Sequence, residues 1–269
     1  MPKTILITGA TDGIGLETAR MLVSDGHQVL LHGRNPAKLA EVKKALSALP
    51  DGGPVASYVA DLSRLDDVVS LAEVVAKNHS SLDVLINNAG VYKAADPITG
   101  DGLDVRFAVN TIAPYLLTQR LLALMGTSGR VINLSSAAQS PVHPKAVAGG
   151  VKLSDGSAYA QSKLAITMWS RAMAHSLKED GPVIVAVNPG SLLGSKMVKD
   201  AFGVAGGDLS IGAEILSRAA LHDDFASASG QYFDNDSGRF AAPHSDALDA
   251  SKVEVVVSAI EAVLRDKAV

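Results

Sequence analysis

Tyr159 and Lys163 form the pair of side chains in this sequence best suited to move a proton. They are four residues apart in an expected helix, so both side chains lie on one face of it. A free tyrosine titrates at about pH 10 and is a poor acid or base at neutral pH. A nearby ammonium group stabilises the phenolate and lowers this pKa, which suits the pair to protonate an alkoxide or deprotonate a hydroxyl group. The same spacing is also common in exposed pairs without function, so the surroundings must decide.

A glycine-rich stretch near the N-terminus has the form of a phosphate-binding loop. Residues 8–15 read Thr-Gly-Ala-Thr-Asp-Gly-Ile-Gly, between an expected strand and an expected helix. Glycines permit a tight turn close to a pyrophosphate, and the helix N-terminus offers free N–H groups. The spacing differs from the general Gly-x-Gly-x-x-Gly fingerprint, so a turn without a ligand is the alternative. The loop residues expected to bind a dinucleotide are Gly9, Thr11, Asp12, Gly13, Ile14 and Gly15.

The end of the second expected strand indicates which dinucleotide would bind. NAD sites usually place an acidic residue there for the ribose 2′-hydroxyl group, whereas residues 32–35 read His-Gly-Arg-Asn. Arg34 could bind a 2′-phosphate through its planar fork, beside Asn35, and Lys38 could assist. We therefore predict NADP(H), with NAD(H) less favoured. Two observations count against this: Arg34 and Lys38 could form an ordinary solvated face, and the charge of Asp12 would repel an added phosphate.

Alternating β-branched runs and amphipathic stretches supply the elements that must position these residues. Strands alternating with helices predict βαβ units. We therefore expect an α/β fold, with residues 1–269 forming a single-domain Rossmann-type doubly wound parallel sheet of about seven strands and helices on both faces. The strands are expected at 3–8, 28–33, 54–60, 83–87, 129–134, 182–187 and near 231–233, and the helices at 14–24, 36–48, 64–79, 103–125, 155–179, 211–221 and 249–265.

Polar residues follow several of these strands. Serines 135 and 136, the Asn-Asn-Ala-Gly at 87–90 and the Asn-Pro-Gly at 188–190 all come where a strand ends, and Asn110 lies inside the next helix. The carboxyl ends of parallel strands meet at one edge, so these groups should converge with the glycine loop. Three stretches break the regular pattern: an insertion loop at 137–154, a substrate segment at 188–210, and an irregular segment at 222–246.

Composition excludes several classes of protein. With 24 Lys and Arg against 28 Asp and Glu, the net charge is −4, and no basic patch indicates nucleic-acid binding. The absence of cysteine excludes disulfides, thiolate chemistry and cysteine-based zinc sites, and the histidines lack metal-ligand spacing. No apolar run reaches the roughly 18 residues of a membrane span. The first expected strand begins at residue 3 with no signal-peptide pattern, so we expect a cytoplasmic protein.

In their order along the chain, these motifs resemble the short-chain dehydrogenase/reductase family in its classical, single-domain form. The resemblance covers roughly residues 3–200, and the ordered set of motifs is highly specific. The matching pieces are the glycine loop at 8–15, Asp61-Leu62, the Asn-Asn-Ala-Gly at 87–90, Asn110, Ser136, Tyr159 with Lys163, and the Asn-Pro-Gly at 188–190.

The resemblance implies a role for each catalytic candidate. Tyr159 would be the general acid in reduction and the general base in oxidation, and Lys163 would lower its pKa and hold the nicotinamide ribose. Ser136, the family's usual match rather than Ser135, would hydrogen-bond the substrate oxygen. Asn110 would support a water-linked proton relay through Lys163. Further cofactor contacts are implied for Asp61 and Leu62 at the adenine, for Asn88, Ala89 and Gly90 at the adenosine ribose, and for Pro189, Gly190, Leu192 and Ser195 at the nicotinamide.

Two departures from the family pattern stand out. Ser136 and Tyr159 are 23 positions apart, a long insertion similar to that of the retinol-dehydrogenase-like and protochlorophyllide-reductase-like branches. Many members place a threonine where this chain has Gly194, and Ser195 could take that role. In resembling proteins the helix carrying Lys163 packs against its twin, which implies a homodimer or homotetramer. Trp169 and Met173 on this helix are therefore candidates for the core or for a subunit interface.

The leading hypothesis is an NADP(H)-dependent carbonyl reductase or alcohol dehydrogenase. The substrate would be a small lipophilic carbonyl compound or alcohol, because the expected pocket segment is apolar. The candidate lining residues are Leu192, Leu193, Met197, Val198 and Phe202. Two alternatives stay open: an enoyl-type double-bond reductase, and a non-catalytic NADP(H)-sensing protein, although such sensors usually lose the tyrosine or the lysine. An extended-type sugar-nucleotide epimerase is disfavoured by the glycine spacing.

Overall fold

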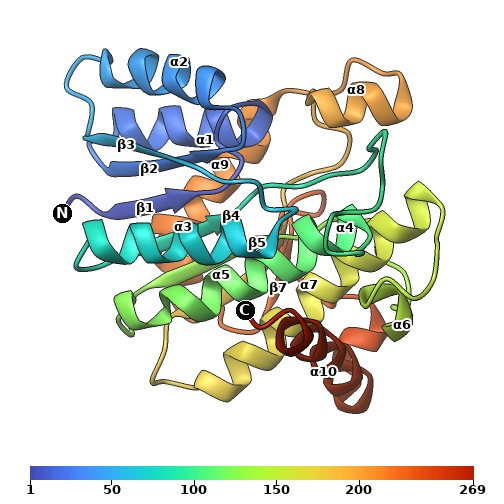
Figure 1. Ribbon diagram of the computed structural model, residues 1–269. Helices are drawn as coiled ribbons and strands as arrows, with labels where there is room; N and C mark the ends of the chain where they lie inside the picture. Colours follow the sequence, from blue (N-terminus) through green and yellow to red (C-terminus); the bar gives the residue numbers. More distant parts are fainter.

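An eight-stranded sheet forms the centre of the molecule (Figure 1). The computed structural model describes the backbone of residues 1–269 and every side chain except those of Ala201 and Phe202, so Phe202 as a lining residue lies outside the described side chains. The strand order is β3-β2-β1-β4-β5-β6-β7-β8; all neighbouring pairs are parallel except β7 with β8. The strands are β1 (Thr4–Ile7), β2 (Gln28–Gly33), β3 (Val55–Val59), β4 (Val84–Asn87), β5 (Arg130–Leu134), β6 (Val183–Asn188), β7 (Tyr232–Asp234) and β8 (Arg239–Ala241).

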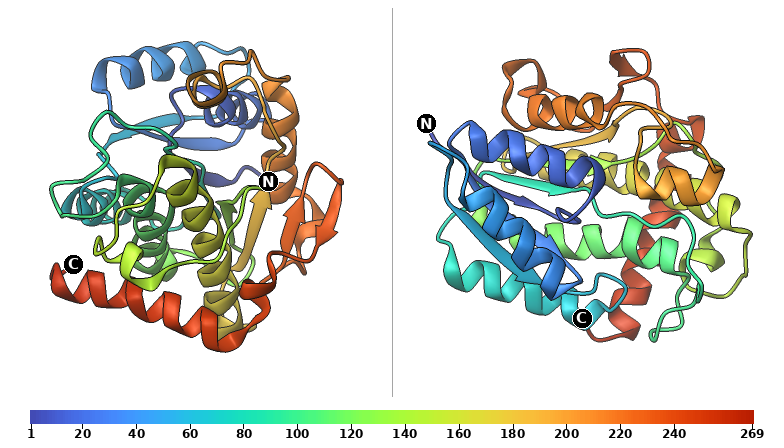
Figure 2. Two further views of the ribbon diagram at one scale, coloured as in Figure 1. Left: turned by 90° about the vertical axis from the view of Figure 1, so that its right-hand side faces the viewer. Right: turned by 90° about the horizontal axis from the view of Figure 1, so that it is seen from above.

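Each face of the sheet carries its own hydrophobic core, because successive strand residues point to opposite faces. Ile5 and Ile7 belong to the core with α1 (Gly13–Ser24), α2 (Pro36–Ser47) and α9 (Leu209–Leu221). Leu6, between them, belongs to the core with α3 (Leu65–Asn78), α5 (Ala113–Leu121) and α7 (Asp155–Leu177). Figures 1 and 2 show these helices as two layers around the sheet. Burial on both faces explains why the strands are apolar throughout.

Helix α10 (Ala250–Asp266) lies against the outer side of α7 (Figure 2). Its Ile260 is fully buried in the same core as Trp169 of α7, which has an exposed fraction of 0%. The Tyr115 ring packs edge-on against Trp169 with centroids 5.4 Å apart, and its hydroxyl group donates to Glu261 of α10 at 3.0 Å. Trp169 is therefore a core residue within one chain, and the same holds for the buried Met173.

The structure corrects the expected elements in four places. The sheet has an eighth, antiparallel strand, β8, which with β7 forms a hairpin inside the segment expected to be irregular. The insertion loop contains a short helix, α6 (Pro144–Val147), and the substrate segment contains α8 (Lys196–Phe202). The single helix expected at 103–125 is divided into α4 (Val105–Phe107), a π-helix (Ala108–Ile112), α5 and a 3₁₀ turn (Leu122–Leu124). Two further 3₁₀ turns are Asp223–Phe225 and Ser245–Leu248.

Candidate active site

A cleft of about 830 Å³ runs along the carboxyl ends of the parallel strands. Its volume suits a small molecule or cofactor. Ser136, Asn110, Gly190 and Leu192 do not line this cleft, and the Leu192 side chain is 53% exposed. The expected site residues that do line it are Gly9, Thr11, Asp12, Gly13, Ile14, Gly15, Arg34, Asn35, Asp61, Leu62, Asn88, Ala89, Gly90, Tyr159, Lys163, Pro189 and Ser195.

The glycine loop is built so that only glycines fit at two of its positions. Gly9 has a φ of +66°, and a Cβ atom there would lie 2.9 Å from Cα of Ala89. A Cβ atom on Gly15 would lie 2.3 Å from Nδ2 of Asn88. Asp12 caps α1 by accepting a hydrogen bond from the backbone N–H of Gly13 at 2.8 Å. The glycine loop therefore places backbone without side chains, together with the N-terminus of α1, at the cleft. This arrangement fits a pyrophosphate group.

Asn88 joins the end of β4 to this loop. Its Nδ2 donates to the carbonyl oxygens of Thr8 at 2.8 Å and Gly9 at 3.1 Å. The backbone N–H of Ala89 donates to the hydroxyl group of Thr8 at 3.1 Å. Asn88 thus fixes the loop against the strand, and its expected contact with a ribose stays a prediction.

His32 is a structural partner of the loop that the sequence reasoning passed over. Its ring is 2% exposed, Nδ1 accepts from the backbone N–H of Gly9 at 3.2 Å, and Nε2 lies 3.1 Å from the carbonyl oxygen of Ala60. Burial lowers its pKa to about 4, so the ring is neutral at physiological pH. The signal in the sequence is a histidine at the end of an otherwise apolar strand that must neighbour the glycine loop.

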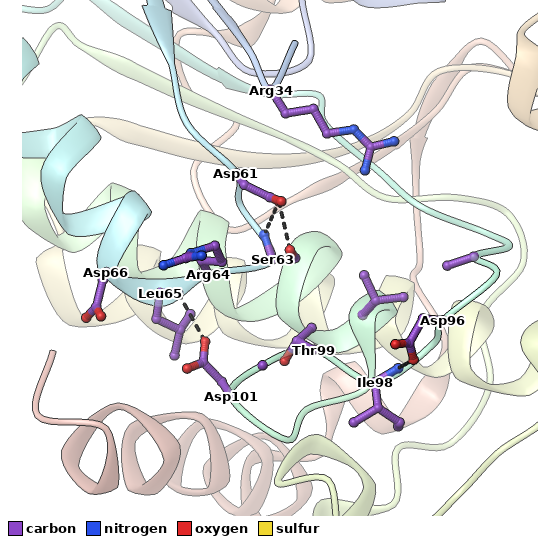
Figure 3. Close-up of a pocket in the computed structure, with 13 residues that line it drawn as sticks. Arg34, Asp61, Ser63, Arg64, Leu65, Asp66, Asp96, Ile98, Thr99 and Asp101 are labelled. Carbon is purple, nitrogen blue, oxygen red and sulfur yellow. Dashed lines mark hydrogen bonds between the residues drawn. The ribbon is translucent and has the colours of Figure 1, made fainter.

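The charge of Asp12 is balanced at the mouth of the cleft. Nζ of Lys38 lies 2.6 Å from Oδ2 of Asp12, and this hydrogen bond is the main reason that the pKa of Asp12 is lowered. Arg34 is exposed, and Figure 3 shows it extending toward a neighbouring hollow of about 540 Å³. After the neighbouring strand β3, Oδ1 of Asp61 accepts from the N–H and hydroxyl groups of Ser63 (Figure 3). A guanidinium group is therefore available beside the cleft at the end of β2.

Tyr159 and Lys163 both line the cleft from α7, and burial shifts the pKa of each. Burial raises the pKa of Tyr159, while a hydrogen bond with the Ser136 side chain lowers it. Nζ of Lys163 donates to the carbonyl oxygen of Leu134 at 2.7 Å and lies 5.8 Å from the Tyr159 ring centre, and its expected lowering of the Tyr159 pKa stays a prediction. Burial lowers the pKa of Lys163 itself to about 8. The tyrosine is therefore protonated at neutral pH, the form that a proton donor requires.

The two serines at the end of β5 face different surroundings. The Ser135 hydroxyl group is buried, 3.0 Å from the carbonyl oxygen of Lys163 and 2.7 Å from the hydroxyl group of Thr167, so it joins β5 to α7. The Ser136 hydroxyl group accepts from the N–H of Ala138 at 3.1 Å and pairs with Tyr159. Of the two, Ser136 is the one beside Tyr159.

Asn110 lies in the π-helical turn, a distortion that often accompanies functional sites. Its Oδ1 accepts from the N–H of Val91 at 2.8 Å, and its Nδ2 donates to the carbonyl oxygen of Val91 at 2.9 Å and to the hydroxyl group of Ser162 at 3.0 Å. The side chain therefore fixes the segment after Gly90 against α7. A proton relay through Lys163 stays a prediction.

Helix α8 reaches across the cleft. Ser195 caps it by accepting from the N–H of Val198 at 3.3 Å, and the Ser195 side chain lies close to Gly13 of the glycine loop. The methyl carbon of Met197 lies close to Gly90. The substrate segment is thus a cover that spans the cleft, and Ser195 is placed near the loop.

The comparisons with known proteins agree with this architecture. The family profile described as "short chain dehydrogenase" matches residues 3–203. The chain is 32% identical to the short-chain dehydrogenase TIC 32 A, chloroplastic, of Brassica napus, covering 86% of this chain and 79% of that protein. It is 29% identical to human retinol dehydrogenase 13, covering 93% and 81%.

Solved structures show the same fold. An uncharacterised protein of Mycobacterium paratuberculosis superposes with a TM-score of 0.80 at 25% identity, over 98% of this chain and 93% of that one. The landomycin C-6 ketoreductase LanV, solved with bound NADP and rabelomycin, superposes with a TM-score of 0.69 at 28% identity, over 87% and 94%.

The chain belongs to the short-chain dehydrogenase/reductase family, in its classical form and retinol-dehydrogenase-like branch. It is an NAD(P)-dependent oxidoreductase of that family. Within the described part of the chain, no helix is long and apolar enough to cross a membrane. The cytoplasmic location and the homo-oligomer stay predictions.

Proposed function

We propose that this protein reduces the carbonyl group of a small lipophilic aldehyde or ketone with NADPH, with Tyr159 as the proton donor. The observation that carries the proposal is Tyr159 on the wall of the cleft, with the Ser136 side chain beside it and the buried ammonium group of Lys163 held by the carbonyl oxygen of Leu134. Tyr159 and Ser136 would present two hydroxyl groups to one substrate oxygen.

Tyr159, Ser136 and Lys163 each have a different role in this reaction. NADPH, when bound, would supply the hydride that the carbonyl carbon receives. The Tyr159 hydroxyl group gives its proton to the carbonyl oxygen, so that the product is an alcohol. The Ser136 hydroxyl group hydrogen-bonds the same oxygen and stabilises the charge that develops on it. Lys163, held by Leu134, keeps a positive charge beneath the tyrosine that favours the phenolate left behind.

The preference for NADPH rests on the end of β2. Arg34 offers a planar fork for the 2′-phosphate, and the pairing of Asp12 with Lys38 removes much of the repulsion expected from the carboxylate. Among solved relatives, LanV and a short-chain dehydrogenase of Burkholderia cenocepacia contain NADP. These relatives support the assignment of NADP to this chain.

We propose a lipophilic substrate because α8 and its neighbours bring apolar residues to the cleft. Val91, Tyr92, Leu134 and Met197 line it, and the Tyr92 ring packs against Tyr159 with centroids 4.9 Å apart. Several curated relatives are retinol dehydrogenases, enzymes named for a lipophilic alcohol. Retinoid-like and aromatic carbonyl compounds are therefore the first substrates to try.

The test is a turnover assay with purified protein. NADPH and NADH oxidation would be followed by absorbance with retinal, aromatic aldehydes, aliphatic ketones and quinones. We expect turnover with NADPH and slower turnover with NADH. Turnover only with an α,β-unsaturated compound, at its double bond, would instead show a double-bond reductase. Tight NADPH binding without turnover of any carbonyl compound would contradict the proposed reaction.

A further inference from the structure

His32 connects three segments of the cofactor cleft that are far apart in the sequence. The ring comes from the end of β2, Gly9 belongs to the glycine loop, and Ala60 directly precedes Asp61 at the end of β3. All of these residues line the cleft. The backbone of His32 adds a further link, because its carbonyl oxygen accepts from the N–H of Ala10 at 2.9 Å.

Only one form of the ring satisfies both side-chain contacts. Nδ1 must be unprotonated to accept from the N–H of Gly9, and Nε2 must carry a proton to donate to the carbonyl oxygen of Ala60. That form is the neutral Nε2–H tautomer. The ring is 2% exposed, so solvent offers no substitute partner for either contact.

We propose that His32 is a positioning residue of the cofactor site, which holds the glycine loop and the Ala60–Asp61 segment at a fixed separation for the pyrophosphate and the adenine of the dinucleotide. This inference rests on the cofactor site proposed above. If the glycine loop is less ordered in the free protein, cofactor binding must order it and loses free energy. A substitution of His32 should therefore weaken cofactor affinity more than it slows the chemical step. His32 itself touches neither the reacting atoms nor the proton donor.

Two substitutions separate the contacts. In His32→Asn, Oδ1 takes the place of Nδ1 and keeps the bond from Gly9. In His32→Gln, Nε2 takes the place of the ring Nε2 and keeps only the bond to Ala60. Loss of one buried hydrogen bond corresponds to about tenfold in affinity. Because either loss releases one of the two segments, we expect the NADPH Kd to rise about tenfold in each variant, with KM for NADPH affected more than kcat.

Tyr58→Phe is the matched control. Tyr58 is the direct register partner of His32 on β3, and its hydroxyl group lies 2.6 Å from Nε2 of His79, outside the cleft lining. Tyr58→Phe removes one hydrogen bond from the same region, so it should lower the melting temperature without moving the NADPH Kd. A Kd in Tyr58→Phe that rises as far as in His32→Gln would overturn the proposal, because affinity would then follow stability alone.

Hydrogen exchange gives a second readout that needs no substrate. The amide of Gly9 should exchange about tenfold faster in His32→Gln, while the amide of Thr8, which donates to Ile86 at 3.0 Å, should not change. Nitrogen NMR of the unaltered protein tests the geometry directly, since we expect the Nε2–H tautomer for His32. The Nδ1–H tautomer, or equal NADPH Kd values in both variants and the unaltered protein, would overturn the inference. If the unaltered protein binds neither NADPH nor NADH, the cofactor site itself is wrong and the inference falls with it.

Discussion

Nη1 of Arg106 lies 2.7 Å from Oδ1 of Asp155, in the first turn of the helix that carries Tyr159 and Lys163. Arg106 is 1% exposed, and its Nη2 pairs with the buried Asp104 at 2.6 Å. Arg106, which makes both ion pairs, lies in α4, immediately before the π-helical turn that contains Asn110. These two ion pairs, one buried and one partly exposed, thus hold the start of α7 to the segment that contains Asn110.

Replacing Arg106 should lower the free energy of unfolding. Arg106→Met leaves the buried Asp104 without its counter-ion, and breaking a buried pair from one side costs about 3–5 kcal/mol. Urea unfolding should show that loss in the free energy of unfolding. The double variant Arg106→Met/Asp104→Leu should recover part of it, because no buried charge is then left unpaired. Equal stability of Arg106→Met and the unaltered protein would show that the network contributes little.

Cofactor preference should depend on Arg34. A charge-assisted pair with the 2′-phosphate is worth about 1.5–3 kcal/mol, so Arg34→Ala should raise KM for NADPH by about 10- to 100-fold. KM for NADH should change by less than about twofold. Lys38→Ala should have a smaller effect, since Lys38 is already paired with Asp12. Equal losses with both cofactors would mean that Arg34 does not contact a 2′-phosphate.

His32 should make the stability of the cofactor-free protein depend on acid pH. Burial lowers its pKa from 6.5 to about 4, so between these values the unfolded chain binds more protons than the folded one. Stability therefore falls as the pH decreases through this range, by about 3 kcal/mol from this group. The difference in unfolding free energy between the unaltered protein and His32→Asn should shrink accordingly from pH 7 to pH 4. A pH-independent difference would show that the ring is not held neutral.

Helix α10 should stabilise the molecule within one chain. Ile260→Ala removes a fully buried side chain between α10 and α7 and should cost about 2–5 kcal/mol. Val255→Ala, on the same helix but 50% exposed, should cost less than about 0.5 kcal/mol. The decrease in the free energy of unfolding of Ile260→Ala should not depend on protein concentration. A loss that grows on dilution would place this side chain at a subunit contact instead.

The order of the fold could be predicted because the central strands β1, β2, β4, β5 and β6 are largely apolar and buried, and helices alternate with them along the chain. Strand β8 was missed since Arg239, Phe240 and Ala241 form too short a run to stand out, and its pairing depends on β7. The cleft could be predicted from the rule that strand ends converge. Contacts between distant residues could not: the bond from Lys163 to Leu134, the three bonds of Asn110 and the ring of His32 all depend on tertiary geometry that spacing does not encode.

The most direct test of the account compares the unaltered protein with Tyr159→Phe at saturating NADPH and a carbonyl substrate. The substitution removes only the hydroxyl group, and general acid catalysis is worth about 10²- to 10⁴-fold. We predict that kcat falls by that factor while the NADPH Kd, measured on the same preparations, stays within about threefold. Tyr92→Phe, which removes the hydroxyl group of the neighbouring ring, should keep most of the activity. Undiminished carbonyl reduction by Tyr159→Phe would contradict the assignment of Tyr159 as the proton donor.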